Sequence, residues 1–146
     1  MTTNAAVDEL QSLLIELTDL ALTGKQAHWN LQGPHFLTRH EQLDTLVTDA
    51  RAWGDEVAER IVAIGTPADA RVATVAEATP LAAFPAGFVA DDKLVGLIVD
   101  RLDPIVERTR ERITNLGDVD LVSQDLVIGI QHGLEKHRWM WAAQQH

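Results

Sequence analysis

The segment from about His35 to Gly65 repeats apolar residues every three or four positions, and this pattern restricts the chain more than any other. The apolar positions are Phe36, Leu43, Leu46, Ala50, Trp53, Val57, Ile61 and Ile64. Residues at this spacing form one stripe along an α-helix, which must be covered by a hydrophobic core. Pro34 suits a first helical turn, and Gly65 is typical of a helix end. The segment therefore predicts a long helix packed against other helices.

Metal-ligand side chains lie beside this stripe in two pairs. His40 with Asp44, and Asp55 with Glu59, are each spaced i, i+4, which puts each pair on one helix face. The pairs are ~16 Å apart along a helix, whereas iron or zinc binds its ligands at ~2.0–2.3 Å. One ion therefore cannot bridge the two pairs of the same chain. A fifth ligand-type residue, His28, precedes the segment.

The two pairs are symmetric about a point between residues 49 and 50. A two-fold axis through that point would place Asp55 and Glu59 of one chain opposite Asp44 and His40 of another. A two-fold dimer interface supplies this kind of self-complementary, antiparallel pairing. The spacing thus predicts a metal site shared between subunits and present twice per dimer. A mixture of imidazole and carboxylate ligands suits Fe(II).

Each of these residues also has an ordinary structural explanation. A histidine beside a helix core is commonly a part-buried packing residue, and carboxylates at i, i+4 are commonly a solvated face. Asp55 could pair with Arg51 one turn earlier, for ~0.2–0.5 kcal/mol. His132 and Glu135 are one turn apart but have no further partner, so we interpret them as surface residues. The shared face and common centre of the two pairs support the metal site, while on spacing alone the structural explanations stay open.

The rest of the chain contains three more stretches with helical periodicity. They run from about Ala5 to Leu31, from the cap at Asp91–Asp92, and from about residue 120 to the end. Pro104 lies inside the second of these stretches and should kink or split it. The first stretch has an apolar stripe of Val7, Leu10, Leu14, Leu17, Leu20 and Ala21.

Between Thr66 and Gly87 three prolines leave room only for a short helix, near Val75–Ala78. A connection of this length implies a crossover between helices that are not antiparallel neighbours. Two helical hairpins joined by such a crossover predict an all-α, ferritin-like four-helix bundle. We expect a single domain over residues 1–146.

The composition limits the function classes. The net charge of −10 disfavours general affinity for nucleic acid, which needs basic side chains to displace phosphate counterions, and suits cations better. There are no cysteines, so disulfides and thiolate metal sites are excluded. No segment reaches the ~20 apolar residues of a membrane span, and the N-terminus does not resemble a signal peptide. We therefore expect a cytoplasmic protein without membrane contacts.

At the level of motifs, the chain resembles the Dps family (DNA-binding proteins from starved cells, the mini-ferritins). The resemblance covers essentially the whole chain, including the proline-containing crossover. It is carried by Lys25-Gln26-Ala27-His28-Trp29-Asn30, Gly33, Phe36, His40, Asp44, Asp55-x-x-x-Glu59-Arg60, Gly65 and Lys136-x-x-Trp139.

The resemblance implies a ferritin-like subunit in a hollow dodecameric shell. It also implies a ferroxidase site at the two-fold interface, which agrees with the symmetry argument. The ligands would be His28, His40 and Asp44 of one chain with Asp55 and Glu59 of the other. Members of the family oxidise Fe(II) to Fe(III), usually with hydrogen peroxide rather than oxygen, and store the ferric mineral inside. Trp29 matches the family's tryptophan beside the site.

Two features depart from the family pattern. Members that bind DNA commonly use a terminal extension rich in lysine and arginine, and neither end here has one. The alternative function, a structural shell that compacts DNA, is therefore disfavoured, as the acidic charge also indicates. Asp120 and Asp125 resemble acidic residues that line the family's iron-entry pores, although Gly129 stands where a further acid is expected.

Overall fold

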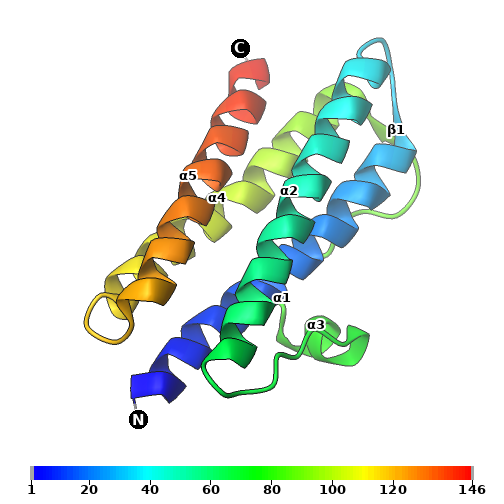
Figure 1. Ribbon diagram of the computed structural model, residues 1–146. Coiled ribbons are helices and arrows are strands. Elements are labelled where there is room, and N and C mark those ends of the chain that lie inside the picture. The colour runs from blue at the N-terminus through cyan, green and yellow to red at the C-terminus, as the bar shows by residue number, and fades with distance from the viewer. Residues whose placement is uncertain (1, 146) are drawn as a thin grey trace.

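Four long helices form the bundle in the computed structural model, which describes residues 2–145 (Figure 1). They are α1 (Thr2–Asn30), α2 (Phe36–Ala63), α4 (Asp91–Leu116) and α5 (Leu121–Ala142). The smaller elements are helix α3 (Val72–Ala78), the 3-10 turn η1 (Ala143–Gln145) and two short strands, β1 (Leu31–Gln32) and β2 (Val89–Ala90). The predicted four-helix architecture is confirmed.

The helices are arranged as two antiparallel hairpins, α1 with α2 and α4 with α5 (Figure 1). Residues 64–90 connect the hairpins and return along the bundle, so that α2 and α4 run in the same direction. The predicted crossover is therefore confirmed. Its short helix is also present, and it starts at Val72, three residues earlier than the sequence indicated.

Three local predictions were wrong in detail. Pro34 lies in a turn before α2, and Asp91 is in the first turn of α4, where Ala90 occupies the cap position. The Asp91 carboxylate instead accepts a hydrogen bond from the backbone N–H of His35. Pro104 does not split α4, because the apolar residues around it, Leu102 and Ile105, are fully buried and hold the helix in the core.

The two strands form a small parallel pair, in which Leu31 lies opposite Val89. This pair joins the end of α1 to the start of α4. The sequence did not predict it, because two residues are too few to show a periodic pattern.

The predicted stripes form the core. Leu10, Leu17 and Leu20 of α1 are fully buried, as are Leu43 and Leu46 of α2. Such leucine side chains each contribute ~1.5–3 kcal/mol when they leave water. Burial of these stripes positions α1 beside α2, and with them the candidate metal ligands.

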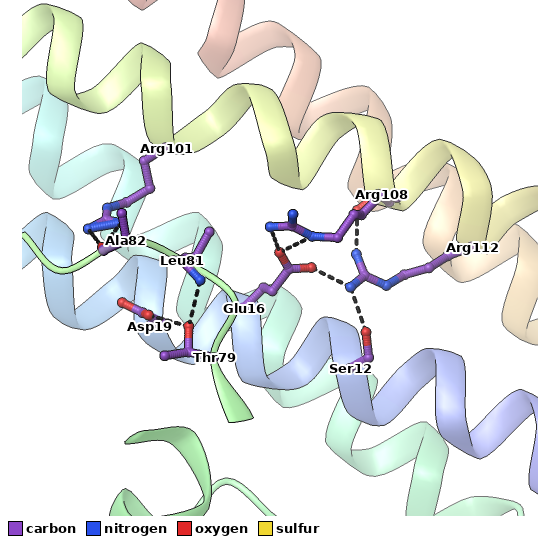
Figure 2. A network of polar contacts seen from close by, with 10 residues as sticks. Ser12, Glu16, Asp19, Thr79, Leu81, Ala82, Arg101, Arg108 and Arg112 are labelled. Carbon is purple, nitrogen blue, oxygen red and sulfur yellow. Dashed lines mark hydrogen bonds and ion pairs between the residues drawn. The ribbon is translucent and has the colours of Figure 1, made fainter. Parts of the chain in front are cut away.

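A charged network lies inside the bundle between α1 and α4 (Figure 2). The carboxylate of Glu16, fully buried, accepts hydrogen bonds from both Arg108 and Arg112. Arg112 also donates to Ser12 at 2.6 Å. A buried carboxylate is tolerated only when it is paired and hydrogen-bonded, so this network fixes the register of α4 against α1.

Replacing Glu16 should therefore destabilise the protein strongly. We expect Glu16→Ala to lower the free energy of unfolding by ~3–5 kcal/mol, because it leaves Arg112 buried without its counter-charge. Urea unfolding at matched protein concentration measures the effect. Glu77→Ala, at an exposed position of α3, is the control and should change stability little. A loss for Glu16→Ala no larger than that of the control would contradict the proposed role of the network.

Candidate metal centre

The end of α1 and the start of α2 bring His28 and His40 together. Nδ1 of His28 is 2.7 Å from the backbone oxygen of His40, and Nδ1 of His40 is 2.7 Å from the backbone oxygen of His28. The rings stack with centroids 3.5 Å apart and an angle of 13° between their planes. Phe36 stacks on the outer face of His40, with centroids 4.9 Å apart.

This reciprocal arrangement fixes which nitrogen of each ring carries a proton. A carbonyl oxygen only accepts hydrogen bonds, so each Nδ1 must carry a proton and donate it. In the neutral form of each ring the lone pair is then on Nε2. A backbone carbonyl bonded to the other ring nitrogen is the usual second-shell support of a metal-binding histidine. In this arrangement Nε2 is the ring nitrogen through which His28 and His40 could hold a metal ion.

Asp44 lies one turn after His40 and is paired with Lys25 of α1. The pKa of the Asp44 carboxyl is lowered, first by the hydrogen bond from Lys25 and further by the positive charge of Lys25. A positive charge on His28 or His40 favours the charged form of Asp44 as well. Asp44 is thus a carboxylate at neutral pH and lies on the same side of the hairpin as the two imidazoles.

Asp55 and Glu59 are exposed on α2, further along the helix. The pKa of Glu59 is raised, first by a hydrogen bond with Asp55 and then by the negative charge of Asp55, with Glu56 adding to it. The two carboxyl groups therefore lie close together and repel each other when both are charged. A bound cation would relieve this repulsion. The alternative ion pair between Asp55 and Arg51 is absent from the part of the chain that the structure describes.

The structure thus groups the five candidate residues into two separate sets. His28, His40 and Asp44 lie at one end of α2, and Asp55 with Glu59 lies nearer the other end. Within residues 2–145 no three ligand-type side chains are close enough to hold one ion. A complete site would need both sets, and a single chain does not bring them together.

Asp120 has the structural role expected of an acidic residue at the start of the last helix, and its pore role, suggested by the family resemblance, stays a prediction. It caps the N-terminus of α5, where its carboxylate accepts from Val122 N at 3.1 Å, Arg60 Nη2 at 2.8 Å and Ser123 Oγ at 2.6 Å. Its hydrogen-bonding capacity is therefore used within the chain. Asp125 is exposed and lines a shallow hollow with Glu56 and Glu59. Of the two aspartates, it is therefore the one whose carboxylate is more accessible to a cation.

The sequence did not predict that two further residues, Lys25 and Phe36, contact the candidate ligands. Lys25 was part of the quoted motif, but its contact with Asp44 bridges two helices and shows no periodic signal. Phe36 was interpreted as a core residue, whereas it is 37% exposed and covers His40. Another histidine, His137, is buried and is not one of the candidate ligands. Its Nε2 atom is 2.6 Å from the carboxylate of Asp49, and its ring packs against Trp53.

Comparison with known proteins identifies the family. The sequence pattern of the ferritin-like domain matches residues 7–146. The DNA protection during starvation protein of Mycolicibacterium smegmatis is 38% identical over 137 residues, which cover 90% of this chain and 72% of that protein. A Dps from Microbacterium arborescens, solved in a high iron form, is 41% identical with a TM-score of 0.92. That match covers 97% of this chain and 93% of the other.

The chain belongs to the Dps family.

The family assignment confirms the resemblance drawn from the sequence motifs, and the ferritin-like fold with it. The likeness extends to DNA protection during starvation protein 2 of Deinococcus radiodurans, which is 32% identical over 138 residues. This Dps-family chain covers 57% of the length of that relative. None of its helices in residues 2–145 is both long and apolar enough to cross a membrane.

The cap at Asp120 makes a testable contribution to stability. Hydrogen bonds, first from Ser123 and then from Arg60, lower the pKa of Asp120 to about 2. A carboxyl whose pKa is lower in the folded state stabilises the fold above its unfolded pKa of ~3.9. That contribution is lost as the pH falls towards the folded value.

We expect Asp120→Asn to reduce the free energy of unfolding by about 2 kcal/mol at neutral pH. The difference from wild type should shrink as the pH falls from ~4 to ~2, because the wild-type carboxyl is then protonated as well. Urea unfolding at a series of pH values measures it, with Asp118→Asn, at an exposed position, as the control. A difference that stays constant over this range would contradict the assignment.

Proposed function

We propose that this Dps-family chain is a ferroxidase and iron store that oxidises Fe(II) with hydrogen peroxide. The observation that carries the proposal is the pair of imidazoles held by each other's backbone, with neither Nε2 hydrogen-bonded to a residue of the described range 2–145, beside the charged carboxylate of Asp44. Neutral imidazole with carboxylate is a donor set that suits iron and leaves coordination positions open. Within the proposed reaction the iron is the substrate.

The site is proposed to be completed by a second subunit. Asp55 and Glu59 of the partner subunit would join His28, His40 and Asp44 across a two-fold axis near residues 49 and 50. A shallow, largely apolar groove between α1 and α2 includes Ala50, next to the predicted axis, and Gly54, one turn further along α2. Leu22 beside it is 59% exposed. Apolar surface at that position supports a contact with another copy of the chain.

The residues have distinct tasks in the proposed reaction. The two imidazoles and Asp44 bind and orient Fe(II), and the two repelling carboxylates, Asp55 and Glu59, favour the arrival of a cation. Two Fe(II) ions each give one electron to one molecule of hydrogen peroxide, whose O–O bond breaks. Water supplies further oxygen to the ferric oxyhydroxide, and protons are released. The ferric product would be stored inside a hollow dodecameric shell of this chain.

The comparisons support the proposal through the relatives. The Microbacterium arborescens structure is of a Dps in a high iron form, and the Mycolicibacterium smegmatis protein is named for DNA protection during starvation. Removal of Fe(II) and peroxide would protect DNA chemically, because together they generate damaging radicals. Direct DNA binding is not needed for this chemical protection. The net charge of −10 also makes DNA binding electrostatically unfavourable.

Iron oxidation is the direct test of the proposed activity. Fe(II) is added to the protein without oxygen, hydrogen peroxide follows, and near-ultraviolet absorbance reports ferric iron. We expect oxidation faster than in buffer, and at least ~10-fold slower with His40→Ala, since ligand support alone is worth 10–100-fold. His132→Ala, at an exposed histidine of α5, should behave as wild type. Oxidation by wild type at the buffer rate would contradict the proposal.

A mixing experiment tests whether the site is shared. Asp55→Ala and His40→Ala chains, each inactive alone, are dissociated, mixed and reassembled. A mixed dimer has one interface with both lesions and one that is intact, so activity near a quarter of wild type is expected from random pairing. A site within one chain could not be rescued in this way. Activity no higher than that of the separate variants, with mixing confirmed by mass, would exclude the shared site.

A further inference from the structure

A cavity lies between α4 and residues 80–85 of the crossover. Its volume is about 350 Å³, at the small end of the range for ligand pockets, ~300–1,000 Å³. Most of its wall is apolar, and the apolar side chains include Pro80, Leu81, Phe84, Pro85, Leu97 and Pro104. A cavity with this size and lining fits the apolar part of a small organic molecule.

Two arginines of α4 add positive charge to the cavity. Arg101 and Arg108, about two helical turns apart, both line it. Their side chains project from α4 towards the crossover (Figure 2). Arg108 donates to the carboxylate of Glu16. Arg101 instead donates from Nη1 and Nη2 to the backbone oxygen of Ala82, at 2.9 and 2.6 Å. The charge of Arg101 therefore meets a neutral carbonyl and not a carboxylate.

Arg101 is a buried cation without a counter-ion. The residue is 7% exposed, and no acidic side chain within residues 2–145 forms an ion pair with it. In the same range its buried Nε atom has no hydrogen-bond partner. Burial lowers the pKa of Arg101, and the negative charge of Asp19 partly offsets this effect. A guanidinium keeps its proton in proteins, and a buried charge is normally paired.

The charges around the cavity limit what can enter it. Arg108 shares the carboxylate of Glu16 with Arg112, so two guanidinium groups are balanced by one negative charge. An anion is therefore attracted to this side of the cavity as well as to Arg101. Asp100 also lines the cavity and is exposed, so it repels additional negative charge. These charges favour a ligand with a single negative charge.

We propose that this cavity binds a small monocarboxylate with an apolar chain. Its carboxylate supplies the counter-charge to Arg101 and Arg108, because a planar guanidinium matches the geometry of a carboxylate. Its chain lies among the apolar side chains of the crossover and α4. The inference goes beyond the proposed iron chemistry and does not depend on it, since no residue of the cavity is a candidate iron ligand.

Titration of the assembled wild-type protein tests the ligand class. Hexanoate, hexan-1-ol and inorganic phosphate are compared by calorimetry. Hexanoate should bind at least ~10-fold more tightly than hexan-1-ol, because hydrogen bonds to a charged group supply such a factor. Phosphate has no chain to bury and should also bind at least ~10-fold more weakly than hexanoate.

Three outcomes of this comparison overturn the proposal. Equal binding of hexanoate and hexan-1-ol removes the role of the arginines. Phosphate binding as tight as that of hexanoate removes the role of the apolar wall. Absence of hexanoate binding by wild type removes the site itself.

A variant that fills the cavity tests where hexanoate binds. Ala83 is exposed and lines the cavity, so the indole of Ala83→Trp should occupy part of it. We expect hexanoate to bind at least ~10-fold more weakly, because loss of about two buried methylene groups is enough for this factor. Ala86→Trp, at an exposed position of the crossover outside the cavity wall, is the matched control and should bind as wild type. Unchanged binding by Ala83→Trp overturns the site.

Removal of the buried charge tests the role of Arg101. In Arg101→Met the advantage of hexanoate over hexan-1-ol should shrink roughly tenfold, while hexan-1-ol binding stays close to wild type. Arg110→Met, on the same helix with a side chain 66% exposed, is the control and should keep the full advantage. An unchanged advantage in Arg101→Met overturns the assignment. The wild-type titrations and Ala83→Trp do not depend on how Arg101→Met folds.

Discussion

The buried carboxylate of Glu16 determines how the two hairpins meet. Two arginines of α4 reach it, of which Arg112 is buried and Arg108 is partly exposed. A shift of α4 by one turn along α1 would leave Glu16 and Arg112 unpaired in the interior. Apolar stripes tolerate small slips, whereas this network does not, so the position of α4 against α1 follows from it.

The same register places the start of α4 against the turn between α1 and α2, next to His28 and His40. Asp91 lies in the first turn of α4 and binds the backbone N–H of His35 just before α2. Gly33, in the turn between α1 and α2, has a φ of 141°, and a Cβ there would clash with the Asp91 carboxylate, so only glycine fits. The turn between α1 and α2, which lies beside the imidazoles, is therefore held by contacts with α1, α2 and α4.

The sequence predicted those features that repeat along one helix. The leucine stripes of α1 and α2 and the i, i+4 ligand pairs were readable, because a helix converts spacing directly into a shared face. The remainder depends on contacts between residues far apart in the chain. The contact of Asp120 with Arg60 of α2 and the contact of Asp91 with the turn at Gly33 are of this kind. The sequence symmetry that suggested a shared site concerns two chains, and one chain shows only its two separate halves.

The main chain of α1 and α2 carries the information that orients the two histidines. Each Nδ1 bonds to the backbone oxygen of the other residue, and the two rings stack as well. A substitution of one histidine removes a candidate ligand and the stacked ring, but it leaves in place the carbonyl that orients the remaining imidazole. Local order at this position therefore outlasts the loss of either side chain, even where the chemistry does not.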